Sequence, residues 1–336
     1  MHSVGLANLG NTCFLNSCIQ ILNQTKELNT LMKTKKYNNA VDAVIVREWL
    51  ELHELMNTSE GIISPNKFVY HVQELAKAKD KNIFSGWSQN DLPEFLLFMI
   101  ECFHNSIKRK VKMKISGNEK TEKDKVAVCC YQMLQHVFEN EYSEILEMFY
   151  AIYVSEIISL DGSTIHTMKP EMFFILDLPI PIQQFDNNTS VTLYDCFEEY
   201  LRPEVLDGDN AWFNETTNQK EGIKKQIVFW NLPKILVIML KRISNFDQKK
   251  MNQLVDFPIT DLNLSKYVSG YNSLKYVYDL FGVCYHYGGM HGGHYTCSVL
   301  NQSQKWLYIN DTHVEEIEDI EQIVKPHSYC LFYRMR

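Results

Sequence analysis

The feature that most constrains the fold is a change in residue pattern near residue 149. Before it, apolar residues recur at helical spacing, as Leu15, Cys18, Ile19 and Leu22 do on one apolar face. After it, short β-rich runs alternate with clusters of Gly, Pro, Asn and Asp. These runs are MFFILDLPI (172–180), KQIVFWNLPKILVIML (225–240), KYVYDLFGVCYHY (275–287), YTCSVL (295–300), KWLYIN (305–310) and YCLFYR (329–334). Helices first and strands later predict an α+β fold, not a repeating βαβ fold.

Further helices are expected at 44–56, 66–77 and 89–103. In the last of these, Asp91 is placed to cap the helix and Glu94 follows three residues later, a spacing typical of a capping box. The lysine-rich stretch IKRKVKMKISGNEKTEKDK (107–125) comes next. We interpret it as a solvated loop or helix face, which is more common than a basic contact patch.

Composition excludes several classes of protein. The chain has 336 residues and a net charge of −8, which argues against a nucleic-acid partner and fits a partner with a basic surface or tail. No apolar run approaches the ~18 residues that span a bilayer, so we expect no membrane insertion. The nine cysteines include no C-x-x-C pair and no secretory signal precedes them. We therefore expect a reducing intracellular compartment, cytoplasm or nucleus, and neither a disulfide framework nor a four-thiolate zinc site.

The stretch GLANLGNTCFLNSC (5–18) places the thiol of Cys13 where a polar loop turns into an apolar helical pattern. A cysteine reacts as the thiolate, and a helix N-terminus favours that form. A nucleophilic thiol also needs a base and a group that orients the base.

His294 is the best candidate for the base. It lies in GGMHGGHYTCSV, where glycines allow close approach of another chain, with His286 and His291 as nearby rivals. Asn310 ends the strand-like WLYIN and is followed by Asp311. A Cys, a His at a strand start and an Asn or Asp on an adjacent strand are typical of a papain-type arrangement.

Several motifs, in order along the chain, resemble the ubiquitin-specific protease family of deubiquitinases. GLANLGNTCFLNS resembles its Cys box, and QNDLPEFL resembles its glutamine-aspartate-glutamate-phenylalanine motif. LPKILVIMLKRI resembles its palm strand, YHYGGMHGGHYTCSV with WLYINDTHV its His box, and SYCLFYR its last strand. The resemblance implies one papain-like catalytic domain over 1–336, with a helical thumb at 1–148 and β-rich fingers and palm at 149–336.

The resemblance also implies a reaction, the hydrolysis of the bond after the C-terminal glycine of ubiquitin. Cys13 aligns with the nucleophile, His294 with the base and Asn310 with the third member of the triad. Asp311 aligns with the second acidic position, and Asn8 with the side chain of the oxyanion hole. Turn chemistry remains an alternative role for Asn8.

For binding, the resemblance implies ubiquitin and ubiquitinated proteins as partners of a monomeric chain without a cofactor. Asp91 and Glu94 match positions that contact basic residues of ubiquitin, and Gly293 and Tyr295 flank the base beside the path of a glycine tail. The alternative for Asp91 and Glu94 is the capping box alone.

The chain departs from the family where many members carry two zinc-binding C-x-x-C pairs. The first pair would fall at Ser159 and Gly162, and the second at Asn214 and Thr217. These residues make no credible zinc site. We therefore expect the fingers to be shortened or held by packing and strand pairing. Two rival functions remain, a ubiquitin-binding module without turnover and a protease for a ubiquitin-like modifier.

Overall fold

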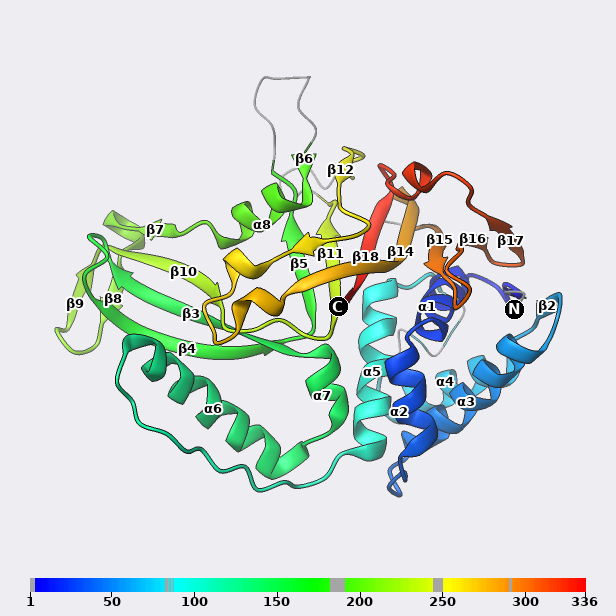
Figure 1. Cartoon of the computed structure of the whole chain (residues 1–336), viewed down its shortest axis with the longest axis horizontal. Helices are drawn as coiled ribbons and strands as arrows, with labels where there is room; N and C mark the ends of the chain where they lie inside the picture. Colours follow the sequence, from blue (N-terminus) through cyan, green and yellow to red (C-terminus); the bar gives the residue numbers. More distant parts are fainter. Residues whose placement is uncertain are drawn as a thin grey trace.

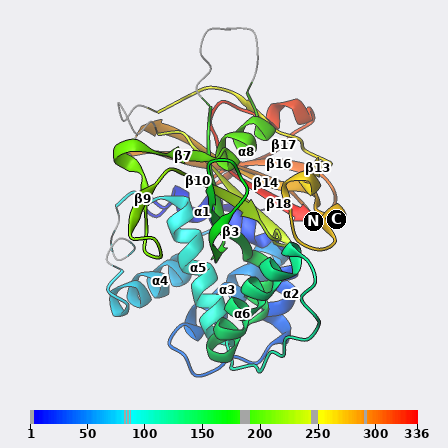
Figure 2. The same ribbon diagram turned by 90° about the vertical axis from the view of Figure 1, so that its left-hand side faces the viewer.

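The computed structural model describes residues 4–81, 84, 86, 88–181, 191–243, 250–289 and 292–336. Helices dominate the first part of the chain and strands the second (Figure 1). The helices are α1 (Cys13–Asn23), α2 (Lys26–Thr34), α3 (Ala43–Thr58), α4 (Asn66–Ala78), α5 (Leu92–Ile107), α6 (Glu122–Glu141), α7 (Glu144–Phe149) and α8 (Leu193–Leu201). Figure 2 shows α2 to α6 gathered below the strands. Within the described residues, no helix combines the length and apolar character that crossing a bilayer requires.

The larger sheet has the order β17-β16-β15-β14-β18-β11-β5, with β13 added to β14. Its central strands pair antiparallel, and only β5 pairs parallel, with β11. The strands are β5 (Ile175–Pro179), β11 (Ile235–Lys241), β13 (Leu262–Asn263), β14 (Val277–Gly289), β15 (Gly292–Leu300), β16 (Trp306–Asn310), β17 (His313–Glu316) and β18 (Ser328–Met335).

A second sheet of order β4-β3-β10-β7 extends away from α1 to α5, toward the left of Figure 1. Helix α6 lies along it, and a small apolar cluster around Cys130, Val154 and Trp230 joins the two. Its strands are β3 (Ala151–Ser159), β4 (Ile165–Phe173), β10 (Ile223–Phe229) and β7 (Glu204–Leu206). Short pairs complete the structure: β1 (Gly5–Leu6) with β2 (Ile62–Ile63), β6 (Val191–Thr192) with β12 (Val255–Asp256), and β8 (Trp212–Asn214) with β9 (Gln219–Glu221).

The α+β prediction is confirmed, and the change of pattern falls where α7 ends at Phe149 and β3 begins at Ala151. The β-rich run 225–240 is not one strand. It divides between β10 in the second sheet and β11 in the larger sheet, and Pro233 lies in the break. Proline has no N–H to donate to a strand ladder, which explains why the run is interrupted there.

Helix α1 is buried on every side, not on one apolar face as its spacing predicts. It packs against α5 and against β14, β15 and β16. Polar side chains on its remaining face form hydrogen bonds inside the protein, although Asn16 Oδ1 is buried without a partner among the described residues. For example, Gln20 Nε2 donates to the Val4 carbonyl at 2.8 Å. Buried polar groups need such partners, so these bonds let a mixed helix run through the core.

The positions that would hold zinc ligands form hydrogen bonds within their own hairpins. Ser159 Oγ donates to Asp161 at 2.6 Å at the β3–β4 turn. In the β8–β9 hairpin, Asn214 Nδ2 donates to both carboxylate oxygens of Glu221 at 3.1 Å, and Thr217 Oγ1 donates to the same side chain. Over the described ranges, no group of three or more His, Cys, Asp or Glu residues has the arrangement of a metal site. The strands of this region are therefore joined by pairing and side-chain hydrogen bonds.

Candidate active site

Cys13 is the first residue of α1, and hydrogen bonds within the preceding loop fix its position. Asn8 Oδ1 accepts hydrogen bonds from the backbone N–H groups of Gly10 and Thr12, each at 3.1 Å. Thr12 Oγ1 accepts from the Leu9 N–H at 2.9 Å. The turn chemistry considered for Asn8 is therefore present, and it fixes the loop that leads into the thiol.

The thiol of Cys13 is only 3% exposed. Burial raises its pKa, because a thiolate loses solvation in the interior. The backbone N–H of Tyr295 opposes this and lowers the pKa, whereas the negative charge of Asp311 raises it further. The N–H groups of Phe14 and Cys13 itself also favour the thiolate. The net pKa is raised, so the helix N-terminus does not by itself produce the depressed value expected from its position.

His294 lies in β15, and its Nε2 is 2.7 Å from Asn310 Oδ1 at the end of β16. An amide oxygen can only accept, so Nε2 carries the proton in this contact and Nδ1 is left for exchange with another group. The next residue, Tyr295, places its backbone N–H at the Cys13 thiol. The structure thus brings three of the predicted residues, Cys13, His294 and Asn310, to one place from α1, β15 and β16.

Asp311 faces the Cys loop and not the imidazole. Its Oδ2 accepts from Asn8 Nδ2 at 2.9 Å, and its Oδ1 accepts from Asn16 Nδ2 at 2.8 Å. Its backbone carbonyl also accepts from the Leu6 N–H at 2.9 Å. The sequence did not point to Asn16, because only the apolar face of this helix was expected to be buried. Asp311 therefore ties the end of β16 to the loop and to the first turn of α1.

Asp91 occupies the N-cap position of α5, but its side chain forms no capping hydrogen bond, so the predicted capping box is wrong. Its Oδ1 accepts from the Tyr295 hydroxyl at 2.7 Å and its Oδ2 from the Tyr329 hydroxyl at 3.0 Å. Burial raises the pKa of this carboxyl, although the two hydroxyl donors lower it. Glu94, one turn further along α5, points into solvent. The two acids thus have different surroundings.

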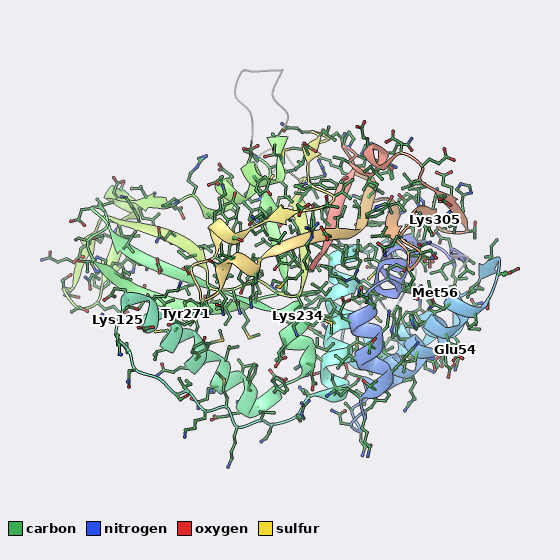
Figure 3. All side chains as sticks on the ribbon, viewed as in Figure 1. Glu54, Met56, Lys125, Lys234, Tyr271 and Lys305 are labelled. Carbon is green, nitrogen blue, oxygen red and sulfur yellow. The ribbon has the colours of Figure 1, made fainter. Side chains whose placement is uncertain are left out.

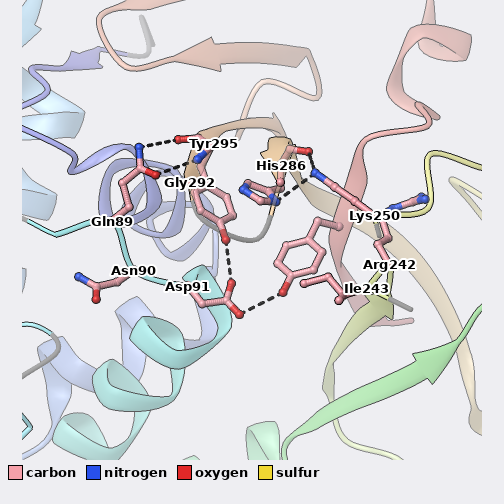
Figure 4. Close-up of a pocket in the computed structure, with 12 residues that line it drawn as sticks. Gln89, Asn90, Asp91, Arg242, Ile243, Lys250, His286, Gly292 and Tyr295 are labelled. Atoms are coloured by element: carbon pink, nitrogen blue, oxygen red, sulfur yellow. Dashed lines mark hydrogen bonds between the residues drawn. The ribbon is translucent and has the colours of Figure 1, made fainter. Parts of the chain in front are cut away.

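Gln89 joins the segment before α5 to the strand of the proposed base (Figure 4). Its Nε2 donates to the Gly293 carbonyl at 3.0 Å, and its Oε1 accepts from the Gly293 N–H at 2.8 Å. A Cβ at Gly293 would lie 2.2 Å from the Tyr287 carbonyl oxygen, so only glycine fits between the strands. Gln89 is not among the predicted site residues, although it is the first residue of the QNDLPEFL motif, and that motif could have indicated this contact.

A cavity of about 250 Å³ lies beside this contact. It is lined by Gln89, Asn90, Asp91, Arg242, Ile243, Lys250, His286, Gly289, Gly292, Gly293, Tyr295 and Tyr329. The rival histidine His286 belongs to this wall: its ring stacks on Tyr295 with centroids 4.5 Å apart, and burial lowers its pKa to about 4. It approaches Lys250 and not Asn310. His291 lies outside the described residues.

The sequence model of the ubiquitin carboxyl-terminal hydrolase family matches residues 4–333. The chain belongs to this family. The resemblance to the ubiquitin-specific proteases is thereby confirmed. Ubiquitin carboxyl-terminal hydrolase 2 of Homo sapiens is 30% identical over 98% of this chain and 55% of its own length. Ubiquitin carboxyl-terminal hydrolase 4 of Saccharomyces cerevisiae (strain ATCC 204508 / S288c) is 26% identical over 98% of this chain and 39% of its own length.

The chain therefore spans about half the length of the family members it matches. Two solved structures of the Ubp8/Sgf11/Sus1/Sgf73 deubiquitinating module of SAGA share its fold, and both cover 99% of this chain and 69% of the matched chain. The one bound to monoubiquitin has a TM-score of 0.70 at 22% identity, and the one bound to ubiquitin aldehyde has 0.72 at 23%. The predicted papain-like α+β fold class agrees with the fold of these two structures.

Proposed function

We propose that the protein is a thiol-dependent deubiquitinase that cleaves the peptide or isopeptide bond after the C-terminal glycine of ubiquitin. The observation that carries the proposal is the His294–Asn310 hydrogen bond of 2.7 Å beside the buried Cys13 thiol. Family membership and the ubiquitin-bound neighbours of the same fold support the choice of ubiquitin as substrate.

In the proposed reaction, Nδ1 of His294 takes the proton of Cys13 as the sulfur attacks the carbonyl carbon of the terminal glycine. The imidazolium then gives this proton to the leaving amine, and a thioester to Cys13 remains. His294 next takes a proton from water, which attacks the thioester and releases the ubiquitin carboxylate. Asn310 acts as a positioning residue, because its oxygen holds the ring with Nδ1 free.

The tetrahedral intermediate carries a negative charge on the former carbonyl oxygen. The Cys13 backbone N–H and an N–H of Asn8 are the proposed donors to it. One N–H of the Asn8 amide is bonded to Asp311, and an amide nitrogen carries two hydrogens, so a second donor remains. The bonds of Asn8 Oδ1 to Gly10 and Thr12 fix the direction in which this nitrogen points.

The proposed path of the ubiquitin tail runs past Gly293 and Tyr295, next to the cavity beside Gln89. The tail expected from the family resemblance ends in Arg-Leu-Arg-Gly-Gly. Glu94 is the acid available to one of these arginines, because it is exposed and has no hydrogen-bond partner among the described residues. Asp91 contributes by holding Tyr295 and Tyr329, and its charge still favours a cation nearby.

The remaining features of the proposal concern the whole chain. It is one catalytic domain, with the thumb at 1–148 and the fingers and palm at 149–336, and we propose a monomer, to which one chain supplies the proposed site residues. It requires no cofactor, nucleic acid or membrane. All nine cysteines are free thiols, which fits a reducing compartment, cytoplasm or nucleus, where the nucleophile stays reduced.

A ubiquitin probe with a thiol-reactive C-terminus, combined with ubiquitin dimers of each linkage, tests the proposal. We expect the wild-type chain to form a covalent adduct and release monomers, and Cys13→Ala to bind ubiquitin without turnover. Binding without an adduct by the wild type would identify a ubiquitin-binding module. Reaction with a probe of a ubiquitin-like modifier, and none with ubiquitin, would identify a protease of that modifier.

A further inference from the structure

A second polar cavity, of about 410 Å³, lies at the end of α1 opposite Cys13. An α-helix rises 1.5 Å per residue, so this cavity is about 15 Å from the thiol along the axis of α1. The lining residues come from the end of α1, α2, α3, the β15–β16 turn and β18. They are Asn23, Gln24, Lys26, Asn29, Thr30, Lys33, His53, Leu300, Asn301, Gln302, Gln304 and Arg334.

The charged side chains that line this cavity, those of Lys26, Lys33 and Arg334, are all cationic. Arg334 is neutralised by Glu27, whose two carboxylate oxygens lie 2.7 and 3.2 Å from the guanidinium. Lys26 and Lys33 are exposed and form no ion pair within the described residues. A cleft with uncompensated charge of one sign concentrates ligands of the opposite sign.

The floor of the cavity is built from buried polar side chains in fixed positions. Asn29 is 5% exposed; its Nδ2 donates to the Asn23 carbonyl at 3.0 Å and its Oδ1 accepts from the Trp49 indole at 3.1 Å. His53 is also 5% exposed, and its Nδ1 lies 2.7 Å from Asn23 Oδ1. Since an amide oxygen accepts, Nδ1 carries the proton and Nε2 has no partner in the described part of the chain. Nε2 is not itself buried but is reached by solvent, and its residue lines the cavity, so it can accept a hydrogen bond from a ligand there.

We propose that this cavity binds a phosphate-bearing small molecule. Two lysines supply point charges suited to a tetrahedral phosphate, and the neutral amides around them supply further donors. A singly protonated phosphate can donate its hydroxyl to His53 Nε2, which a carboxylate cannot do. The volume exceeds that of a phosphate group and lies in the range of small-molecule sites, so the phosphate brings an organic part of about the size of a sugar.

Thermal unfolding with inorganic phosphate as the probe tests the site. A ligand that binds only the folded state raises the melting temperature, and we expect a rise of at least about 3 °C at 20 mM phosphate, relative to NaCl of equal ionic strength. Lys26→Gln with Lys33→Gln should remove more than half of this rise. The matched control is Lys110→Gln with Lys112→Gln, two exposed lysines outside the cavity, which should keep it. No rise in the wild type, or an equal rise in both double variants, would overturn the proposal.

The source of the phosphate and the place of binding are tested separately. Ribose 5-phosphate should stabilise the protein at lower concentration than inorganic phosphate or free phosphoserine if the organic part fills the cavity.

Burial and Lys33 lower the pKa of His53 to about 4. A bound anion offsets the charge of Lys33, so the NMR titration of the His53 ring should move to higher pH with phosphate present. Stabilisation without any change at His53 would place the anion elsewhere and contradict this site. Neither outcome depends on deubiquitinase activity, so the two proposals fail independently.

Discussion

Asn310 and Asp311 are adjacent in the sequence, but their side chains contact different parts of the protein. Asn310 holds the imidazole of His294, whereas Asp311 accepts from Asn8 and Asn16. The reversal of direction has a backbone cause, since Asp311 has a φ of 48°, in the left-handed region that Asp tolerates better than most residues. The backbone conformation at Asp311 therefore decides which of the two side chains reaches the imidazole of His294.

This difference gives a prediction for activity and stability. Cys13→Ala should abolish turnover, and His294→Ala should be nearly as damaging, because general acid–base catalysis contributes about 10²–10⁴-fold. Asn310→Ala should lose less than His294→Ala, at most about 10²-fold in kcat, with little change in melting temperature.

Asp311→Ala should instead lower the free energy of unfolding by about 2 kcal/mol, since two amides lose a charged acceptor. Steady-state kinetics and thermal melts measure both effects, and a larger loss of kcat in Asp311→Ala than in Asn310→Ala, at matched stability, would reverse the assignment.

The raised pKa of Cys13 gives a second prediction at this scale. A pKa above the ordinary thiol value means that the thiolate fraction at neutral pH is smaller than usual and grows as the pH rises toward that pKa. Alkylation of Cys13 by iodoacetamide in the free protein should therefore accelerate throughout the alkaline range. Asp311→Asn should shift the midpoint to lower pH, because the charge of Asp311 is one cause of the raised value. Mass spectrometry of the Cys13 peptide follows the reaction, with Cys13→Ala as the blank, and a midpoint below neutral pH would contradict the prediction.

At the scale of elements, the start of α5 holds the sheet through side chains. Asp91 accepts from Tyr295 in β15 and Tyr329 in β18, and Gln89 pairs with both backbone groups of Gly293. Strand β15 also carries His294, so the position of the proposed base depends on a helix that is distant in sequence. Asp91 therefore has a positioning role in addition to any contact with substrate.

Asp91 and Glu94 should consequently behave differently when changed. Asp91→Ala removes the acceptor of two tyrosine hydroxyls, so we expect the free energy of unfolding to fall by about 2–3 kcal/mol and kcat/KM to fall with it. Glu94→Gln changes an exposed side chain, so the melting temperature should stay within about 1 °C. If Glu94 binds a tail arginine, kcat/KM should still fall roughly tenfold.

A ubiquitin substrate with its tail arginines replaced is the control for this pair. The loss caused by Glu94→Gln should shrink on that substrate, whereas the loss caused by Asp91→Ala should persist on both. Equal losses of the Glu94 variant on the two substrates would show that the residue does not recognise the tail.

The molecule as a whole consists of a helical half and a β-rich half that meet along α1. One apolar cluster includes Phe14 and Ile19 of α1, Phe95 and Phe98 of α5, and Cys297 of β15, so it spans both halves. The second sheet extends beyond this core, as Figure 1 shows. Figure 3 labels Lys125 in α6 and Tyr271 in the loop before β14, and the Tyr271 hydroxyl donates to Asp124 of α6. This hydrogen bond joins α6 to that loop, and the apolar cluster around Cys130, Val154 and Trp230 joins α6 to the extended sheet.

For the whole protein we predict that the purified chain contains no stoichiometric zinc and keeps its activity and melting temperature in a chelator. In the β8–β9 hairpin, Glu221 joins Asn214 and Thr217, the positions where the family resemblance implies zinc ligands. Glu221→Ala should therefore lower the melting temperature, while EDTA should not. Elemental analysis that finds about one zinc per chain would contradict this, because a structural zinc site needs a full ligand set.

The sequence by itself determined the fold class and the candidate catalytic residues. Periodicity separates the helical part from the β-rich part, and the motifs around Cys13, His294 and Asn310 predict a nucleophile, a base and a group that orients the base. The tertiary structure alone decided how they are used. The raised pKa of Cys13 depends on burial and on the amide of Tyr295, and the carboxylate of Asp91 serves tyrosines from β15 and β18 instead of its own helix. Local patterns encode helices, strands and caps, whereas desolvation and long-range hydrogen bonds depend on segments that only packing brings together.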